Sequence, residues 1–140
     1  MHTYAQLGKN QQGMSLLELV IVIVLIGGLL AVLGSRIIGS KARAEYKLAQ
    51  AQVEGLSQKI ELYYVDVGEY PKQLDDLVQA PAEANTWLGP YAKATEFKDP
   101  WAMPIEYRVP DDMSNYTLTS LAADRKAGGT GVDKDIVVSP

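Results

Sequence analysis

The chain has 140 residues, 47% of them hydrophobic and 21% charged, and a length of this order builds one modest domain. It has no Cys and a single His, at position 2, which excludes disulfide frameworks, Cys-ligated zinc, iron–sulfur clusters and multi-His metal centres. The net charge of −4 argues against a nucleic-acid partner, because such proteins carry a basic binding surface.

Residues 14–35 form an apolar run, MSLLELVIVIVLIGGLLAVLGS, in which Glu18 is the only charged side chain. A helix over residues 14–38 would be about 37 Å long, which is enough to cross a bilayer core of about 30 Å. Ionisable residues inside such spans are costly and usually serve a function. Glu18 is therefore a candidate functional residue.

After residue 35, charged side chains appear and the apolar residues recur at steps of three and four. This spacing indicates one amphipathic face on a helix. The face consists of Tyr46, Ala49, Val53, Leu56, Ile60, Tyr63 and Val67. We therefore predict one helix over residues 14–67, apolar all round in its first half and ending before Gly68.

The rest of the chain consists of short segments separated by turns. The pattern predicts a helix over residues 72–79, strands over 105–109 and 116–120 paired across a turn, and a last strand over 136–138. The expected fold class is α+β. We expect Asp75-Asp76 and Asp111-Asp112 to be exposed. Four aromatic residues are expected to anchor the loops on the long helix: Trp87, Tyr91, Phe97 and Trp101.

Three ordinary interpretations of the apolar run are open. A buried core helix fits poorly, because a run that is apolar all round does not suit so short a soluble chain. A secretory signal cleaved at Ala42-Arg43-Ala44 would place the cleavage site nine residues beyond the run, past Arg36. An ordinary membrane anchor leaves Glu18 unexplained.

A fourth interpretation comes from Gly13-Met14-Ser15-Leu16-Leu17-Glu18-Leu19, which resembles the processing site of type IV pilin-like proteins. The resemblance implies a leader, residues 1–13, that a prepilin peptidase removes after Gly13. It also implies N-methylation of Met14 and a requirement for Glu18 in assembly. Residues 14–38 would be the transmembrane and filament-core helix, and residues 39–140 a periplasmic globular domain.

Further motifs resemble the major pseudopilins of type II secretion systems. They are YYVD at 63–66 with GEYP at 68–71, KDPWAMPIEYR at 98–108, and SLAAD at 120–124 leading through GGTG at 128–131 to DKDI at 133–136. The resemblance implies a type IV pilin-like fold, in which the long helix packs on a small C-terminal antiparallel sheet with a calcium-binding loop. It implies a structural subunit, not an enzyme, that polymerises to help export folded proteins across the outer membrane.

The same resemblance implies the location and the partners. The chain would sit in the bacterial inner membrane with one span and its C-terminal domain in the periplasm. Its partners would be further copies of itself in a helical homopolymer, minor pseudopilins, the inner-membrane assembly platform and the prepilin peptidase, with no nucleic acid. Two alternatives are a type IV pilin for adhesion, motility or DNA uptake, and a secreted binding module or enzyme released after Ala44.

The Gly-rich acidic loop after residue 120 is the candidate metal site. Spaced Asp residues offer oxygen ligands to Ca²⁺, although such a loop is more often merely solvated. The resemblance implies one Ca²⁺ held by Asp side chains and backbone carbonyls. The expected ligands are Leu121, Asp124, Lys126, Asp133 and Asp135. Ala122 and Arg125 stand where the family tends to have Gly.

Overall fold

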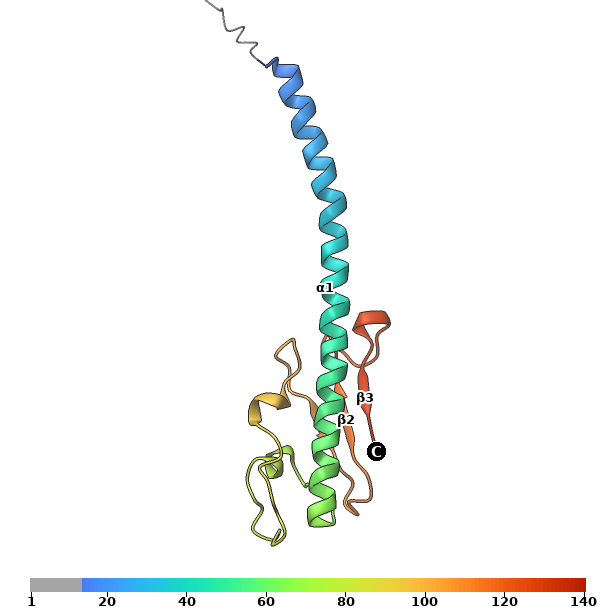
Figure 1. Cartoon of the computed structure of the whole chain (residues 1–140). Coiled ribbons are helices and arrows are strands. Elements are labelled where there is room, and N and C mark those ends of the chain that lie inside the picture. Colours follow the sequence, from blue (N-terminus) through green and yellow to red (C-terminus); the bar gives the residue numbers. More distant parts are fainter. Residues whose placement is uncertain (1–13) are drawn as a thin grey trace, which may run out of the picture. The chain divides into compact units, whose positions relative to one another are not determined.

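The computed structural model describes residues 14–140 and contains one long helix, three short 3-10 helices and a small sheet (Figure 1). The chain divides into two units, Met1–Gly39 and Ser40–Pro140, and helix α1 contributes to both. In chain order the elements are α1 (Leu16–Val67), η1 (Leu74–Leu77), η2 (Ala94–Phe97), β1 (Glu106–Arg108), β2 (Thr117–Ser120), η3 (Gly131–Asp133) and β3 (Ile136–Val138).

The predicted long helix is confirmed, but it starts two residues later than expected. Ser15 is the residue before the helix, and its Oγ accepts a hydrogen bond from the Leu17 N–H at 3.3 Å. This satisfies one of the free amides of the first turn, so the helix begins at Leu16. At the other end, Gly68 has a φ of +91° and donates its N–H to the Tyr64 carbonyl at 2.8 Å, a left-handed ending that glycine adopts readily.

The core of the second unit forms on the predicted apolar face of α1. Ala49, Val53, Leu56, Ile60 and Tyr63 are all buried, as their spacing predicted. Facing residues come from the rest of the unit and include Leu77, Ile105, Tyr116, Leu118 and Ile136. Strands β2 and β3 lie alongside the second half of α1 (Figure 1). Burial of apolar side chains against a sheet of three short strands therefore holds this unit together.

The sheet is antiparallel, with the order β1-β2-β3. Glu106 of β1 lies opposite Thr119, and Ser120 at the end of β2 lies opposite Ile136 of β3. The predicted strands and their pairing are confirmed, with slightly shorter bounds for the first two. In β2, Leu118 and Ser120 are buried while Thr117 and Thr119 are half-buried, in keeping with the alternation of side chains along a strand.

The predicted helix over residues 72–79 is wrong, because only the 3-10 helix η1 forms there. The Asp76 carboxylate accepts the N–H groups of Lys72 and Gln73, at 3.0 and 3.2 Å, and this closes a turn in front of Leu74. The Leu77 carbonyl accepts the N–H groups of Tyr91 and Ala92, so it is used by another segment. These bonds replace the ladder that a longer helix would need.

The surface prediction was wrong for Asp76, which is buried, and right for Asp75, Asp111 and Asp112. The prediction for the four aromatic anchors is confirmed. Trp87, Tyr91, Phe97 and Trp101 are half-buried against the core.

Candidate assembly and metal-binding sites

The apolar half of α1 buries almost none of its side chains within the chain. Leu16 is 80% exposed and Ile38 is 72% exposed, and the large apolar residues between them are exposed too. By length and composition, α1 is the one helix of the described chain that could cross a membrane. Such a surface is unstable in water, so this half of the helix needs an apolar environment that the single chain does not supply.

Met14 and Glu18 both lie at the N-terminal end of this surface and are exposed, whereas Gly13 lies outside the described residues. Glu18 stands in the first turn of α1, where a carboxylate interacts favourably with the positive end of the helix dipole. Its carboxylate is therefore accessible to a group on another molecule.

The C-terminal loop, residues 121–135, joins β2 to β3 and contains every expected metal ligand. Asp135 makes two hydrogen bonds to Gly128 across the loop. Its Oδ2 accepts the Gly128 N–H at 2.8 Å, and its own N–H donates to the Gly128 carbonyl at 3.0 Å. Gly129 has a φ of +81°, and a Cβ added there would lie 2.1 Å from the Asp133 carbonyl oxygen. The backbone of the loop is thus drawn tightly together around positions 128–135.

The acidic residues of this loop are placed differently. Asp124 is exposed and its Oδ1 accepts the Lys126 N–H at 3.1 Å, whereas Asp133 and Asp135 are half-buried. Across residues 14–140, no three His, Cys, Asp or Glu side chains gather into a metal-binding cluster. The Oδ1 atom of Asp135 is nevertheless buried without a hydrogen-bond partner. A buried carboxylate oxygen without a donor is a costly group that a cation would satisfy, so this residue fits the expected Ca²⁺.

Two residues of this loop have a backbone conformation that favours glycine, at the two positions where the resemblance led us to expect Gly. Ala122 and Arg125 have φ values of 54° and 58°, in the left-handed region that favours glycine.

Two polar residues beside the loop are not identifiable from the sequence alone. Asp99 and Ser120 are buried and hydrogen-bonded to each other at 2.8 Å. The Asp99-Pro100 pair signals a turn, but no local pattern identifies a partner 21 residues away.

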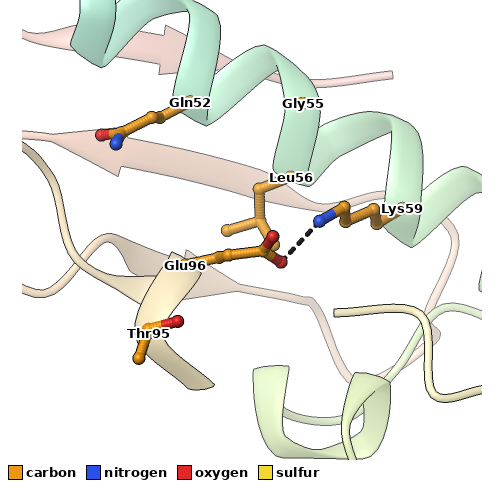
Figure 2. A pocket seen from close by; sticks show the side chains of 6 residues that line it. All are labelled: Gln52, Gly55, Leu56, Lys59, Thr95 and Glu96. Carbon is orange, nitrogen blue, oxygen red and sulfur yellow. Dashed lines mark hydrogen bonds and ion pairs between the residues drawn. The ribbon is translucent and has the colours of Figure 1, made fainter. Parts of the chain in front are cut away.

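A cavity of about 270 Å³ lies apart from both sites, between α1 and η2. Figure 2 shows its lining side chains, with Lys59 of α1 reaching across to Glu96 of η2. The hydrogen bond from Lys59, with a second from the Lys93 N–H, holds the pKa of Glu96 below its usual value. The pair ties η2 to the helix, and none of the expected functional residues lines the cavity.

Comparison with known proteins gives two matches that together cover most of the chain. Residues 36–139 match the family model of type II secretion system protein G, and residues 8–34 match the prokaryotic N-terminal methylation motif. The chain is 50% identical over 127 residues to the type II secretion system core protein G of Xanthomonas campestris, covering 91% of this chain and 89% of the relative. It is 31% identical to the protein of that name in Vibrio cholerae, with 91% of each chain covered, and 29% identical to the one in Pseudomonas aeruginosa, with 91% of this chain and 94% of that protein covered.

Proposed function

Because this chain belongs to the type II secretion system protein G family, we propose that it is the major structural subunit of a secretion pseudopilus, and that it polymerises through α1. The relatives named above are secretion core proteins, and nothing in the matches favours a type IV pilin for adhesion, motility or DNA uptake. The family is one of structural pseudopilins and not a known class of enzymes.

The observation that carries this proposal is the exposed apolar half of α1. The lipid bilayer covers this surface before assembly, and equivalent helices of other copies cover it in the filament. The same residues therefore serve as a membrane anchor and later as filament core. In this proposal the subunit is anchored in the inner membrane by one span and has its C-terminal unit in the periplasm.

Processing prepares the N-terminal end of α1 for assembly. A prepilin peptidase cuts after Gly13, and the new terminal amine of Met14 is methylated, in agreement with the methylation motif matched over residues 8–34. The Glu18 carboxylate of one copy then pairs with the Met14 amine of its neighbour. Two charges that would be costly alone in apolar surroundings are thereby neutralised together, and the pairing sets the axial register of the subunits.

The C-terminal loop holds one Ca²⁺ in this proposal. The buried Oδ1 atom of Asp135, which has no hydrogen-bond partner, supports this assignment. Asp124 and Asp133 are the other two side-chain ligands in the proposal. The carbonyls of Leu121 and Lys126 complete the set of oxygen ligands, the type that Ca²⁺ prefers. When bound, the ion neutralises the acidic side chains and joins the two ends of a loop that has little apolar surface to bury. The remaining partners are minor pseudopilins and the inner-membrane assembly platform.

The test is assembly of a Glu18→Gln variant in cells, with Glu83→Gln as a matched control at an exposed carboxylate of the second unit that pairs with Lys72. We expect the Glu18 variant to be processed but to form no filaments, and the control to assemble like the wild type. The intact mass of the mature protein should correspond to a chain beginning at methylated Met14. A mature chain beginning at Glu45, or normal filaments from Glu18→Gln, would rule the proposal out.

A further inference from the structure

The buried Asp99 carboxylate joins the turn before β1 to the end of β2. Its Oδ1 accepts the N–H groups of Trp101 and Met103, at 3.0 and 2.9 Å, and its Oδ2 accepts the Ser120 hydroxyl at 2.8 Å. Asp99 is 5% exposed and Ser120 is fully buried. Both oxygens are therefore held in place by donors that no solvent competes for, which makes this a rigid connection.

The connection continues from Ser120 into the C-terminal loop. Because the Ser120 hydroxyl donates its proton to Asp99, its oxygen faces other groups as an acceptor, and the Ala122 N–H lies 3.4 Å away. Ala122 is fully buried and has a φ of 54°. The Asp99 carboxylate is thus linked, through the Ser120 hydroxyl, to the peptide group between Leu121 and Ala122 at the start of the loop.

That peptide carries one of the expected calcium ligands. The Ala122 N–H and the Leu121 carbonyl belong to the same planar peptide group, in which the N–H and C=O bonds of a trans peptide point in opposite directions. Holding the Ala122 N–H toward Ser120 Oγ therefore fixes the direction of the Leu121 carbonyl. A ligand held in one direction before the ion arrives loses less conformational entropy on binding than a free one.

We propose that Asp99 and Ser120 are positioning residues for calcium: through the Ala122 N–H they hold the Leu121 carbonyl in the orientation that binds the ion. The inference rests on the proposed calcium site. Neither side chain contacts the ion, and the effect passes through the peptide plane, in the way that outer hydrogen-bond partners orient metal ligands.

The chain supplies matched controls for both residues. Ser114 donates its hydroxyl to Asp112 at 2.9 Å in an exposed turn, which repeats the Ser–Asp pair away from the loop. Ser120→Ala removes the link, and Asp99→Asn reverses it, because the amide oxygen stays with the two backbone donors and the NH₂ group faces Ser120. Ser114→Ala and Asp112→Asn make the same chemical changes in the control pair.

The experiment measures the calcium dissociation constant of the full-length protein in detergent by isothermal titration calorimetry, and its melting temperature in chelator. Loss of an outer partner typically weakens metal binding by about 10-fold or more, so we expect the Kd to rise by at least about that factor in Ser120→Ala and Asp99→Asn. The control variants should keep the wild-type Kd. A merely structural role would lower the melting temperature in chelator and leave the Kd unchanged, and that result would overturn the inference.

A second measurement covers variants that fail to fold. Coupling between two sites is reciprocal, so calcium bound by the wild-type loop should slow hydrogen exchange of the Trp101 and Met103 amides, which donate to Asp99. Exchange rates that ignore calcium would contradict the inference while leaving the calcium site intact. A wild-type protein that shows no calcium binding at all would instead remove the calcium proposal, and this inference with it.

Discussion

Arg125 is a residue whose backbone and side chain are poorly matched. Its φ of 58° lies in the left-handed region, and its side chain is exposed, so no burial offsets the strain. The clash between Cβ and the following carbonyl in this region costs about 1–2 kcal/mol for an ordinary residue. Ala122 has similar backbone, but its buried methyl group contributes packing that glycine would lose.

We therefore expect Arg125→Gly to stabilise the protein. Relief of about 1–2 kcal/mol of strain exceeds the cost of about 0.4–1 kcal/mol for the greater freedom of glycine in the unfolded chain. The net rise in the free energy of unfolding, measured with urea in chelator, should be about 0.5–1 kcal/mol. Lys134→Gly is the control, because Lys134 is also exposed but has an ordinary φ of −71°, and it should destabilise the protein. A loss of stability in both variants would show that position 125 is not strained.

Single polar residues were the hardest features to predict from the sequence. Asp76 reads as a surface charge, yet it accepts backbone N–H groups and is buried. Asp99 reads as a turn residue, and its bond to Ser120 depends on tertiary contacts between distant segments. By contrast, Glu18 stands out from the sequence, because an isolated charge in an apolar run is conspicuous without any fold, and Met14 was predicted from the resemblance of residues 13–19 to a pilin processing site.

Two buried tyrosines and one half-buried tyrosine link α1, β1 and β2. Tyr63 lies on α1, Tyr107 on β1, and Tyr116 directly before β2. Tyr116 shares a 2.7 Å hydrogen bond with Ser57 of α1, and Tyr107 donates its hydroxyl to the Pro71 carbonyl at 2.7 Å. Burial raises the pKa of Tyr63 and of Tyr116 to about 12, and it also raises the pKa of Tyr107.

These shifts predict a loss of stability at high pH. In the unfolded chain the tyrosines release their protons near pH 10, whereas Tyr63 and Tyr116 keep theirs in the folded chain up to about pH 12. Between these pH values the folded state therefore binds more protons than the unfolded state. The contribution of these tyrosines to the free energy of unfolding is fully present below about pH 10 and is lost as the pH rises toward about 12.

The measurement is tyrosinate absorbance during an alkaline titration. We expect a late-ionising group of tyrosines in the folded protein that disappears in denaturant, and a smaller late group in Tyr116→Phe. A single transition near the ordinary tyrosine pKa in the folded protein would contradict the prediction.

Elements were predictable where a period repeats. The long apolar face of α1 and the alternation in the strands were read correctly because each pattern reports one buried face. Helices η2 and η3 went unpredicted, since 3-10 turns of four and three residues have no period to detect. The predicted helix over 72–79 failed because backbone carbonyls there bond to a distant segment.

At the scale of the whole molecule, the second unit contains the buried core that stabilises the fold, and the first unit contains the helix surface proposed for assembly. The buried core belongs entirely to the second unit, and no described residue of the first unit contributes to it. The first unit's part of α1 is held by its own backbone hydrogen bonds and exposes its apolar side chains. Removing that part should therefore abolish assembly and remove the need for detergent. The fold of the second unit should stay intact.

We expect a chain beginning at Ser40 to fold without detergent and to melt cooperatively, as monitored by circular dichroism. Its gel-filtration volume should correspond to a monomer, because the surface proposed to form the filament core is gone. The full-length protein should require detergent under the same conditions. A Ser40 chain that shows no cooperative transition would mean that the second unit depends on the first.

Over evolutionary time, the crowding of Gly129 against Asp133 leaves position 129 almost no freedom to drift. Any codon change that replaces this glycine adds a carbon at a place already taken by the Asp133 carbonyl. Ala127, two positions earlier, has an exposed side chain, so a larger side chain there would extend into solvent. Among descendants of this gene, position 129 should therefore stay glycine, while position 127 should accept a range of side chains.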